Sequence, residues 1–345
     1  MKIALDTMGG DHAPKVTVKG AIQALEEKKD FIIILVGKKE LIEYELEKYK
    51  YDKARIEIKD AREVIEMTDD PVIAVKAKKD SSMNISLELV QNSEANATVS
   101  AGNTGALIAA SQLKLKRIKG VLRPCIATMF PSKKGHMVIL DVGAVSDSRP
   151  EFLSQYAILG SKYAEIALEI KEPKVGLLNI GSEEGKGNEL TRKSYELLSE
   201  QENICFKGNV EPHLMLNGEY DVIVTDGYTG NILLKATEGT AKFIMGFLKE
   251  EIFKSFLAKI GGFILKPIFN KMRKTMDSSE YGGAIFLGLN QISVKAHGGS
   301  DENGIMNAIL AATKFVEANL VEKIKIEIGK DLIKNNDDKE EMIDL

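Results

Sequence analysis

Four glycine-rich polar turns, each directly after a short apolar run, place the strongest constraint on the fold of this chain. They span residues 7–14, 100–105, 179–188 and 225–231. Glycine lets the backbone come close to a ligand, and the first turn of a helix offers unpaired N–H groups to an anion. Because each turn stands where a strand gives way to a helix, the sequence predicts an α/β fold whose loops form a cleft for phosphate.

Short runs rich in β-branched residues alternate with amphipathic stretches along the chain. This pattern is typical of a mostly parallel sheet with helices on both faces. The predicted strands are 2–6, 31–36, 55–59, 97–100, 125–129, 137–141, 174–180, 203–206, 221–225 and 291–296. The predicted helices are 14–28, 39–48, 71–79, 83–93, 104–115, 150–169, 188–200, 231–256 and 304–319.

Length and composition favour one large domain. No repeat or low-complexity linker divides the 345 residues, so we expect a single α/β domain over 1–330 and a charged, frayed tail over 331–345. The net charge of −4 gives no support to nucleic-acid binding. Cys125 and Cys205 show neither metal-ligand spacing nor a disulfide framework, which favours a reducing cytoplasm and predicts no metal and no cofactor. We see no signal peptide and no apolar run near the ~20 residues that span a bilayer.

Residues 245–276 differ from the rest of the chain. Two acidic residues oppose seven basic ones, namely Lys249, Lys254, Lys259, Lys266, Lys271, Arg273 and Lys274. Apolar residues recur at helical spacing on both sides of Gly261-Gly262, among them Phe256, Leu257, Ile260 and Phe263. The sequence therefore predicts a protruding, basic, amphipathic helical hairpin with its break at the two glycines, suited to a membrane surface or an acidic partner. A hairpin packed into a homodimer interface, with its lysines in solvent, is the alternative.

The turn at 100–105 is the strongest candidate for phosphate. The hydroxyls of Ser100 and Thr104, the amide of Asn103 and the backbone at Gly102 and Gly105 can meet one anion at a helix start. An ordinary helix cap is the alternative.

The turn after the first strand adds further phosphate candidates, Asp6, Gly9, Gly10 and Asp11. His12, in the same turn, can orient phosphate or protonate a leaving thiolate. The alternative is a structural role, which is more common for a lone histidine.

The two later turns supply the other candidates. Lys186, between two glycines, can reach a phosphate or a developing oxyanion, unless Glu183 or Glu184 simply pairs with it. Asp226 and Asn231 stand at another helix start, where an amide or a backbone N–H can bind a thioester oxygen, and a capped turn is the alternative. The predicted cleft is completed by Asn188, Thr229, Gly230 and His297.

These motifs together resemble those of a known family. Asp-Thr-Met-Gly-Gly-Asp-His-Ala-Pro at 6–14, Ser-Ala-Gly-Asn-Thr-Gly-Ala at 100–106, the run 176–188, Asp-Gly-Tyr-Thr-Gly-Asn at 226–231 and Ser-Glu-Tyr-Gly-Gly-Ala at 279–284 occur in family order. They cover about residues 1–320 and resemble the signatures of the PlsX family, the bacterial phosphate acyltransferases of phospholipid synthesis. Residues 141–147 and 208–215 depart from the family pattern.

The resemblance implies an α/β/α sandwich like those of phosphotransacetylases and isopropylmalate dehydrogenases. It implies transfer of a long fatty acyl group from acyl carrier protein to inorganic phosphate, giving acyl phosphate for a glycerol-phosphate acyltransferase. Family members are homodimers that associate peripherally with the inner face of the cell membrane. For this chain the resemblance therefore implies acyl carrier protein, phosphate, a second copy and an anionic membrane surface as partners.

Such a reaction requires no protein nucleophile, because phosphate itself can attack the thioester. We expect Lys186, His12, Asp226 and Asn231 to carry the catalytic roles and both cysteines to be inert core residues. A short-chain phosphotransacetylase acting on acyl-CoA is a close alternative. A metal-dependent decarboxylating dehydrogenase and a non-catalytic membrane scaffold fit the motifs less well.

Overall fold

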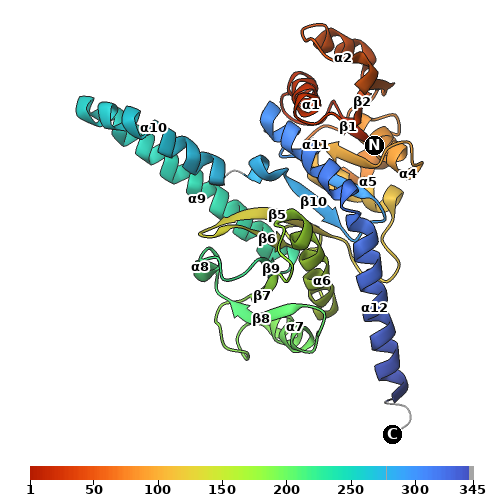
Figure 1. The fold of residues 1–345 in the computed structure, drawn as a ribbon, viewed down its shortest axis with the longest axis vertical. Coiled ribbons are helices and arrows are strands. Elements are labelled where there is room, and N and C mark those ends of the chain that lie inside the picture. Colours follow the sequence, from red (N-terminus) through yellow and green to blue (C-terminus); the bar gives the residue numbers. More distant parts are fainter. Residues whose placement is uncertain (277, 342–345) are drawn as a thin grey trace.

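The computed structural model describes residues 1–276 and 278–341, with side chains at all of these positions except 270, 273–279 and 331–341. Eleven strands form one continuous sheet (Figure 1). In spatial order they are β3 (Ile56–Asp60), β2 (Ile32–Gly37), β1 (Lys2–Asp6), β4 (Ala97–Ser100), β11 (Ile292–Lys295), β10 (Ala284–Leu287), β5 (Cys125–Ser132), β6 (Gly135–Leu140), β9 (Val222–Val224), β7 (Lys174–Leu178) and β8 (Cys205–Val210).

The sheet is mostly parallel but consists of two halves that point in opposite directions. β3, β2, β1, β4 and β11 are parallel, and so are β6, β9, β7 and β8. Between the halves, the pairs β11–β10, β10–β5 and β5–β6 are antiparallel. Three reversals leave the second half running opposite to the first.

Helices cover both faces of the sheet, which gives the predicted α/β/α sandwich. One core lies under α1, α6, α7, α11 and α12, and the other under α3, α4, α5 and α8. The helices are α1 (Lys15–Glu27), α2 (Lys39–Leu46), α3 (Pro71–Ala77), α4 (Ser82–Gln91), α5 (Thr104–Leu115), α6 (Pro150–Ala167), α7 (Glu189–Ser199), α8 (Pro212–Met215), α9 (Gly227–Lys254), α10 (Phe256–Met276), α11 (Glu302–Glu317) and α12 (Leu320–Glu341), with 3₁₀ turns η1 (Lys53–Arg55) and η2 (Ser278–Tyr281).

α9 and α10 pack against each other and extend away from the sheet as a long hairpin (Figure 1). The break between them lies at Ser255, so the prediction of a break at Gly261-Gly262 is wrong. Ser255 has an extended backbone, and its hydroxyl accepts a hydrogen bond from the Ala258 amide at 3.4 Å. Serine favours this capping position, whereas a glycine inside a helix costs only about 1 kcal/mol, so the serine decides where the second helix begins.

The sequence prediction missed the strand β10 and the helix α12, as well as the one-turn helix α8 and both 3₁₀ turns. β10 follows Gly282-Gly283 and is a short, wholly apolar run, Ala-Ile-Phe-Leu, with no alternation that separates a strand from a helical segment. α12 continues from Leu320 into the charged tail as far as Glu341, and residues 342–345 lie outside the described chain. The predicted fraying of 331–345 thus falls on residues whose side chains or backbone are not described.

Candidate functional site

Three polar residues stand side by side at the carboxyl ends of neighbouring parallel strands. Asp6 on β1 is in register with Ser100 on β4, and Ser100 is in register with Lys295 on β11. All three side chains are buried. We call this group the anion cluster. In open α/β sheets ligands bind at the carboxyl ends of the strands, so this edge is where a substrate site is expected.

Hydrogen bonds hold the anion cluster together but leave some polar atoms unpaired. The Ser100 hydroxyl donates to Asp6 Oδ2 at 2.6 Å and accepts from the Gly102 amide at 3.1 Å. The Lys295 ammonium donates to the carbonyl oxygen of Ala296. Within the cluster, Asp6 Oδ1 is buried without a hydrogen-bond partner in the described structure, as is the hydroxyl of Ser300 in the turn after β11. Buried polar atoms without partners are costly, so the cluster has hydrogen-bonding capacity for a ligand.

Burial shifts the ionisation of both charged members of the cluster. It lowers the pKa of the Lys295 ammonium from 10.5 to about 8, although the carboxylates of Asp6 and Asp11 oppose this fall. Burial also raises the pKa of the Asp6 carboxyl above 3.8, against hydrogen bonds from Ser100 and Ser82. A buried cation that keeps its proton near neutral pH is suited to holding a phosphate.

Glycines let the backbone close around this site. A Cβ at Gly9 would lie 2.6 Å from Asp6 Oδ2 and 2.7 Å from the Gly102 amide, so no larger residue fits between the two turns. Gly10 has a φ of +101° and lies against the Gly298 carbonyl. The predicted glycine turns after β1 and β4 are therefore in direct contact with each other.

The other predicted residues of the 100–105 turn have structural partners. Asn103 Oδ1 accepts from the Ala106 amide at 3.0 Å and caps α5, while its Nδ2 donates to the Met67 carbonyl at 3.1 Å. Asn103 thus has the capping role that was the alternative to phosphate binding. Thr104 is exposed at the start of α5, and Gly105 packs against Pro71.

His12, Asp11 and His297 lie at the rim of the same edge. The Asp11 amide donates to the Gly298 carbonyl at 2.9 Å, which joins the turn after β1 to the turn after β11. His297 is exposed, and its Nδ1 accepts from the Gly299 amide at 3.1 Å. His12 is also exposed. The structure therefore places His12, Asp11 and His297 at the same edge of the sheet as the anion cluster, and their predicted roles stay predictions.

A second set of predicted residues surrounds Asp141. The Asp226 side chain caps α9 by accepting a hydrogen bond from the Thr229 amide at 2.9 Å. A capped turn was the alternative to a role in binding the thioester oxygen. Gly230 is packed so tightly on the Asp141 carbonyl that a Cβ would overlap it. Asn231 lies beside Gly143, and Gly143 belongs to the turn after β6. Thr229 is exposed on this turn.

Asp141 holds the turn that follows β6. Its buried carboxylate accepts from the amides of Ile126 at 2.9 Å, Gly143 at 3.1 Å and Val145 at 2.9 Å, and from Ala144. Burial raises its pKa above 3.8, although these backbone donors oppose the rise. Both carboxylate oxygens of Asp141 accept hydrogen bonds from backbone amides, so this side chain holds the loop in place.

Lys186 and Asn188 belong to the turn after β7. Lys186 is half-exposed, and its Nζ lies 3.7 Å from Glu183 Oε1, the ion pair that was the alternative to a catalytic role. Asn188 caps α7 by accepting from the Thr191 amide at 2.9 Å. Asn179 fixes the turn through its Nδ2, which donates to the Lys186 carbonyl at 3.0 Å.

Strand direction separates these turns into two groups. Turns after β1, β4 and β11 leave one edge of the sheet, whereas those after β6, β9 and β7 leave the opposite edge, because the halves run in opposite directions. The sequence predicts one cleft lined by all four glycine turns. In a single chain the sheet instead places two of these turns at one edge and two at the opposite edge. Strand order cannot be read from the turns themselves, which is why the motifs alone did not reveal this division.

Lys295 is the main site residue that sequence reasoning missed. The signal was present, since Ser293 and Lys295 alternate with apolar residues on a strand whose four residues are all buried. A charged residue on one face of a buried strand indicates a buried polar site. Cys125, by contrast, is buried as expected, and burial raises the pKa of its thiol well above 9.0, whereas Cys205 is only partly buried and not the core residue that we expected.

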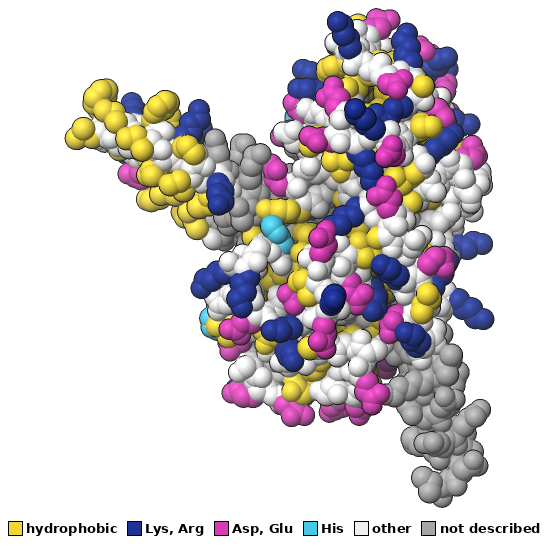
Figure 2. All heavy atoms as spheres, viewed as in Figure 1, with side chains coloured by type: hydrophobic (Ala, Val, Ile, Leu, Met, Phe, Trp, Pro, Cys, Tyr) yellow, Lys and Arg dark blue, Asp and Glu magenta, His cyan; other side chains and the backbone are white. Residues whose placement is uncertain are grey.

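The hairpin carries a large exposed apolar surface. Phe256, Leu257 and Phe263 are each about four-fifths exposed, and Ile260 about half. Figure 2 shows yellow side chains gathered along the projecting helices, with lysines between them. Lys249, Lys254, Lys259, Lys266 and Lys271 are exposed, whereas the predicted contact residue Arg273 has a side chain outside the described residues.

Within 1–276 and 278–341, no helix combines the length and apolar character that crossing a bilayer requires. Monomeric soluble proteins rarely expose apolar patches of this kind without a binding partner.

The fold defines the class. The chain has the architecture of the phosphotransacetylases: one from Streptococcus pyogenes superposes with a TM-score of 0.62 at 16% identity, covering 92% of this chain and 94% of that one. EutD phosphotransacetylase from Staphylococcus aureus gives a TM-score of 0.59 at 14% identity, with the same coverage. At these identities the likeness establishes the fold alone.

Sequence comparison then gives the family. A family model described as "Fatty acid synthesis protein" matches residues 1–323. The chain is 59% identical over 326 residues to a phosphate acyltransferase of Fusobacterium nucleatum, covering 94% of this chain and 98% of the relative. It is 48% identical to one of Clostridium perfringens over 330 residues, 96% of this chain and 97% of the relative. The chain belongs to this family, the phosphate acyltransferases or PlsX family, and is an acyltransferase.

Proposed function

We propose that this enzyme transfers a long-chain fatty acyl group from acyl carrier protein to inorganic phosphate, making acyl phosphate for phospholipid synthesis. The observation that carries the proposal is the anion cluster, where Lys295, Ser100 and Asp6 stand in register at the carboxyl ends of three neighbouring strands. In a phosphate acyltransferase, a buried cation with adjacent hydroxyls and unpaired polar atoms is a suitable phosphate site.

The chemistry follows from this placement. A phosphate oxygen held near Lys295 forms the new bond to the acyl carbon, the carbon–sulfur bond breaks, and the carrier thiolate leaves and takes up a proton. Lys295 neutralises phosphate charge, and the Ser100 hydroxyl orients it. His12 and His297, exposed at the rim, are candidates for the proton donor to the thiolate. The remaining predicted catalytic residues, Lys186, Asp226 and Asn231, stand at the opposite edge of the sheet and require a separate test.

We further propose that the enzyme works in the cytoplasm as a homodimer attached peripherally to the inner face of the membrane. The exposed Phe256, Leu257 and Phe263, with lysines beside them, support docking on an anionic lipid surface. Weak, reversible attachment would keep a long-chain product near the membrane where the glycerol-phosphate acyltransferase consumes it. Packing of the hairpin against a second copy is the competing interpretation.

The direct test supplies the purified enzyme with long-chain acyl carrier protein and labelled phosphate, and measures label in lipid-soluble product. A parallel reaction with acetyl-CoA tests the short-chain phosphotransacetylase alternative. We expect label transfer from the long-chain carrier substrate and little from acetyl-CoA. The reverse preference would overturn the proposed donor, and no label from either would overturn acyl transfer to phosphate in this chain.

A further inference from the structure

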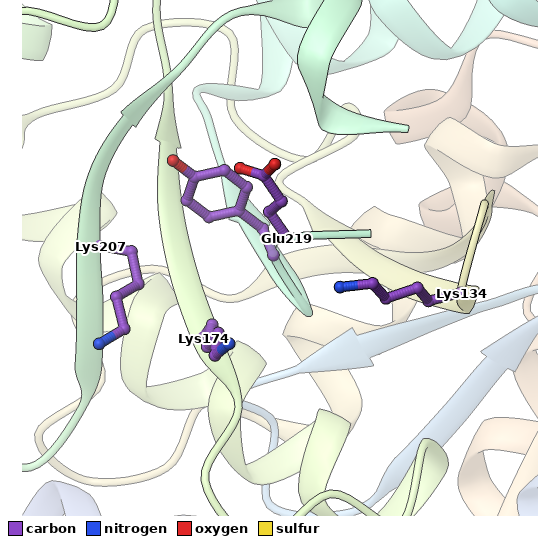
Figure 3. Close-up of a pocket in the computed structure, with 5 residues that line it drawn as sticks. Lys134, Lys174, Lys207 and Glu219 are labelled. Carbon is purple, nitrogen blue, oxygen red and sulfur yellow. The ribbon is translucent and has the colours of Figure 1, made fainter. Parts of the chain in front are cut away.

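A basic pocket lies in the second half of the sheet, apart from the anion cluster. This cavity of about 280 Å³ is lined by Lys134, Lys174, Lys207, Glu219 and Tyr220 (Figure 3). We call it the three-lysine pocket. None of its residues belongs to the glycine turns or to the hairpin, so the functions considered above leave it unexplained.

Well-ordered elements hold the three lysines in place. Lys134 lies in the turn between β5 and β6, Lys174 begins β7, and Lys207 lies within β8. The turn is fixed by the Lys133 amide, which donates to the Leu216 carbonyl at 2.8 Å. Gly218 has a φ of +78°, and a Cβ there would lie 2.8 Å from Lys134 Cγ, so the glycine makes room for the Lys134 stem.

The pocket has an uncompensated positive charge. Three lysines and one carboxylate, that of Glu219, line the cavity, and the nearby Asp221 carboxylate accepts from the Lys174 backbone amide at 2.8 Å. Among side chains that the structure describes, no carboxylate lies within 4.0 Å of the Nζ atoms of Lys134, Lys174 or Lys207. Elsewhere on the sheet, lysines pair closely, as Lys2 does with Glu57 at 2.8 Å. In a chain whose net charge is −4, such a group of unpaired cations is available to an acidic partner.

The arrangement fits an acidic protein surface better than a compact anion or a lipid. In Figure 3 Lys207 and Lys134 lie on opposite sides of the cavity, with Glu219 between them, so the ammonium groups do not converge on one point. The lining contains no arginine fork to grip a single phosphate. It also lacks the protruding apolar side chains that a lipid surface needs, which are on the hairpin instead. Lysines that are spread across a cavity in this way can pair with several carboxylates spread along one helix of a partner protein.

The pocket also opens at the same edge of the sheet as the anion cluster. β7 runs opposite to β11, so the start of β7 at Lys174 and the turn at Lys134 lie at the edge where β1, β4 and β11 end. Five inter-strand steps separate β7 from β11. At about 4.8 Å per step the two sites lie ~24 Å apart along the sheet, so one large partner protein can cover the pocket while its acyl group points toward the anion cluster.

We propose that the three-lysine pocket docks the acidic face of the carrier protein that delivers the acyl chain. This inference rests on the proposed donor but is tested separately from it. A triple charge reversal, Lys134→Glu with Lys174→Glu and Lys207→Glu, is compared with a control triple, Lys29→Glu with Lys50→Glu and Lys53→Glu. The control lysines are exposed in the first half of the sheet, and both triples change the net charge equally.

Binding of acyl-free carrier protein is measured by calorimetry at low salt, and turnover is measured with both acyl carrier protein and long-chain acyl-CoA. The pocket triple should weaken carrier binding and raise KM for the carrier substrate by about tenfold or more, because each exposed charge pair contributes modestly and three are reversed. Turnover of acyl-CoA should stay within about twofold, which also shows that the variant is folded. A neutral Lys→Gln triple should give an intermediate loss.

Equal weakening by both triples would show a general charge effect and overturn the pocket as the docking site. Unchanged carrier binding in the pocket triple would overturn it as well. Wild-type enzyme that uses acyl-CoA but binds no carrier protein would instead overturn the proposed donor, and with it this inference.

Discussion

Replacing Lys295 by methionine tests the anion cluster most directly. Methionine keeps most of the length and flexibility of the lysine stem and removes only the ammonium. If Lys295 binds phosphate, the variant loses one charge-assisted interaction, worth about 1.5–3 kcal/mol. That corresponds to a roughly 10- to 150-fold loss in kcat/KM for phosphate at neutral pH.

The same change has a defined effect on stability. Burial lowers the Lys295 pKa from 10.5 to about 8. At 1.36 kcal/mol per pKa unit, keeping this charge buried at pH 7 costs the native state about 3 kcal/mol. The methionine variant avoids this cost, so at pH 7 we expect it to be as stable as wild type or more so, even though activity falls.

The lowered pKa of Lys295 determines the sign of the change in stability with pH. Between about pH 8 and 10.5 the native state has released a proton that the unfolded state still holds, so wild-type stability rises with pH in this window. The stability advantage of the variant should therefore shrink from pH 8 to 10. Phosphate affinity of wild type should fall as pH rises through about 8, because the ammonium becomes neutral, and the variant should lack this step.

The assays are kcat/KM for phosphate and calorimetric unfolding, each measured from pH 6.5 to 10 on both proteins. Ser100→Ala is the companion variant, since it removes the hydroxyl of the anion cluster without changing its charge. Phosphate kinetics within about twofold of wild type in Lys295→Met, with the step near pH 8 retained, would refute the role of Lys295.

Four further changes test other parts of the molecule. If Lys186 has its predicted catalytic role, Lys186→Ala should lower turnover sharply with the fold intact, and near-normal acyl phosphate formation would leave Lys186 only its ion pair with Glu183. Leu257→Glu should reduce sedimentation with anionic vesicles while soluble activity persists; unchanged sedimentation would favour the dimer interpretation. Cys125→Ala should leave catalysis largely intact, because the buried thiol is held protonated, and a trapped acyl-cysteine would contradict direct attack by phosphate. Gly230→Ala should destabilise the fold by about 1–3 kcal/mol through overpacking, whereas Gly239→Ala, in open space on the same helix, should stabilise it by up to about 1 kcal/mol in urea unfolding; equal effects would refute the packing argument.

Much of the fold was predictable because local signals were strong. β4 and α5 have the predicted bounds, and Asn103 between them is a residue type that favours helix caps. Pro150 begins α6 as predicted, since proline tolerates the first helical turn. In each case the residue that sets the boundary acts on its immediate neighbours, so no tertiary information was needed.

The candidate site was less predictable because it depends on strand order. Asp6, Ser100 and Lys295 are far apart in the sequence and meet only because β1, β4 and β11 are neighbours in register. The glycine motifs located two of these three strands. The alternation of Ser293 and Lys295 with apolar residues gives that strand one polar face, but helices from other parts of the chain decide whether this face is buried or exposed to solvent.

The opposite directions of the two half-sheets bear on how the whole enzyme works. Phosphate and carrier protein are both anionic, and a single basic site would have them compete. The structure instead provides a buried cation at the end of β11 and exposed cations at the start of β7. Because β7 runs opposite to β11, these two sites share one edge of the sheet while remaining five strand spacings apart. If the carrier protein docks in the three-lysine pocket as proposed, it does not compete with phosphate for one basic site, and the reversal of the sheet is what makes that geometry available.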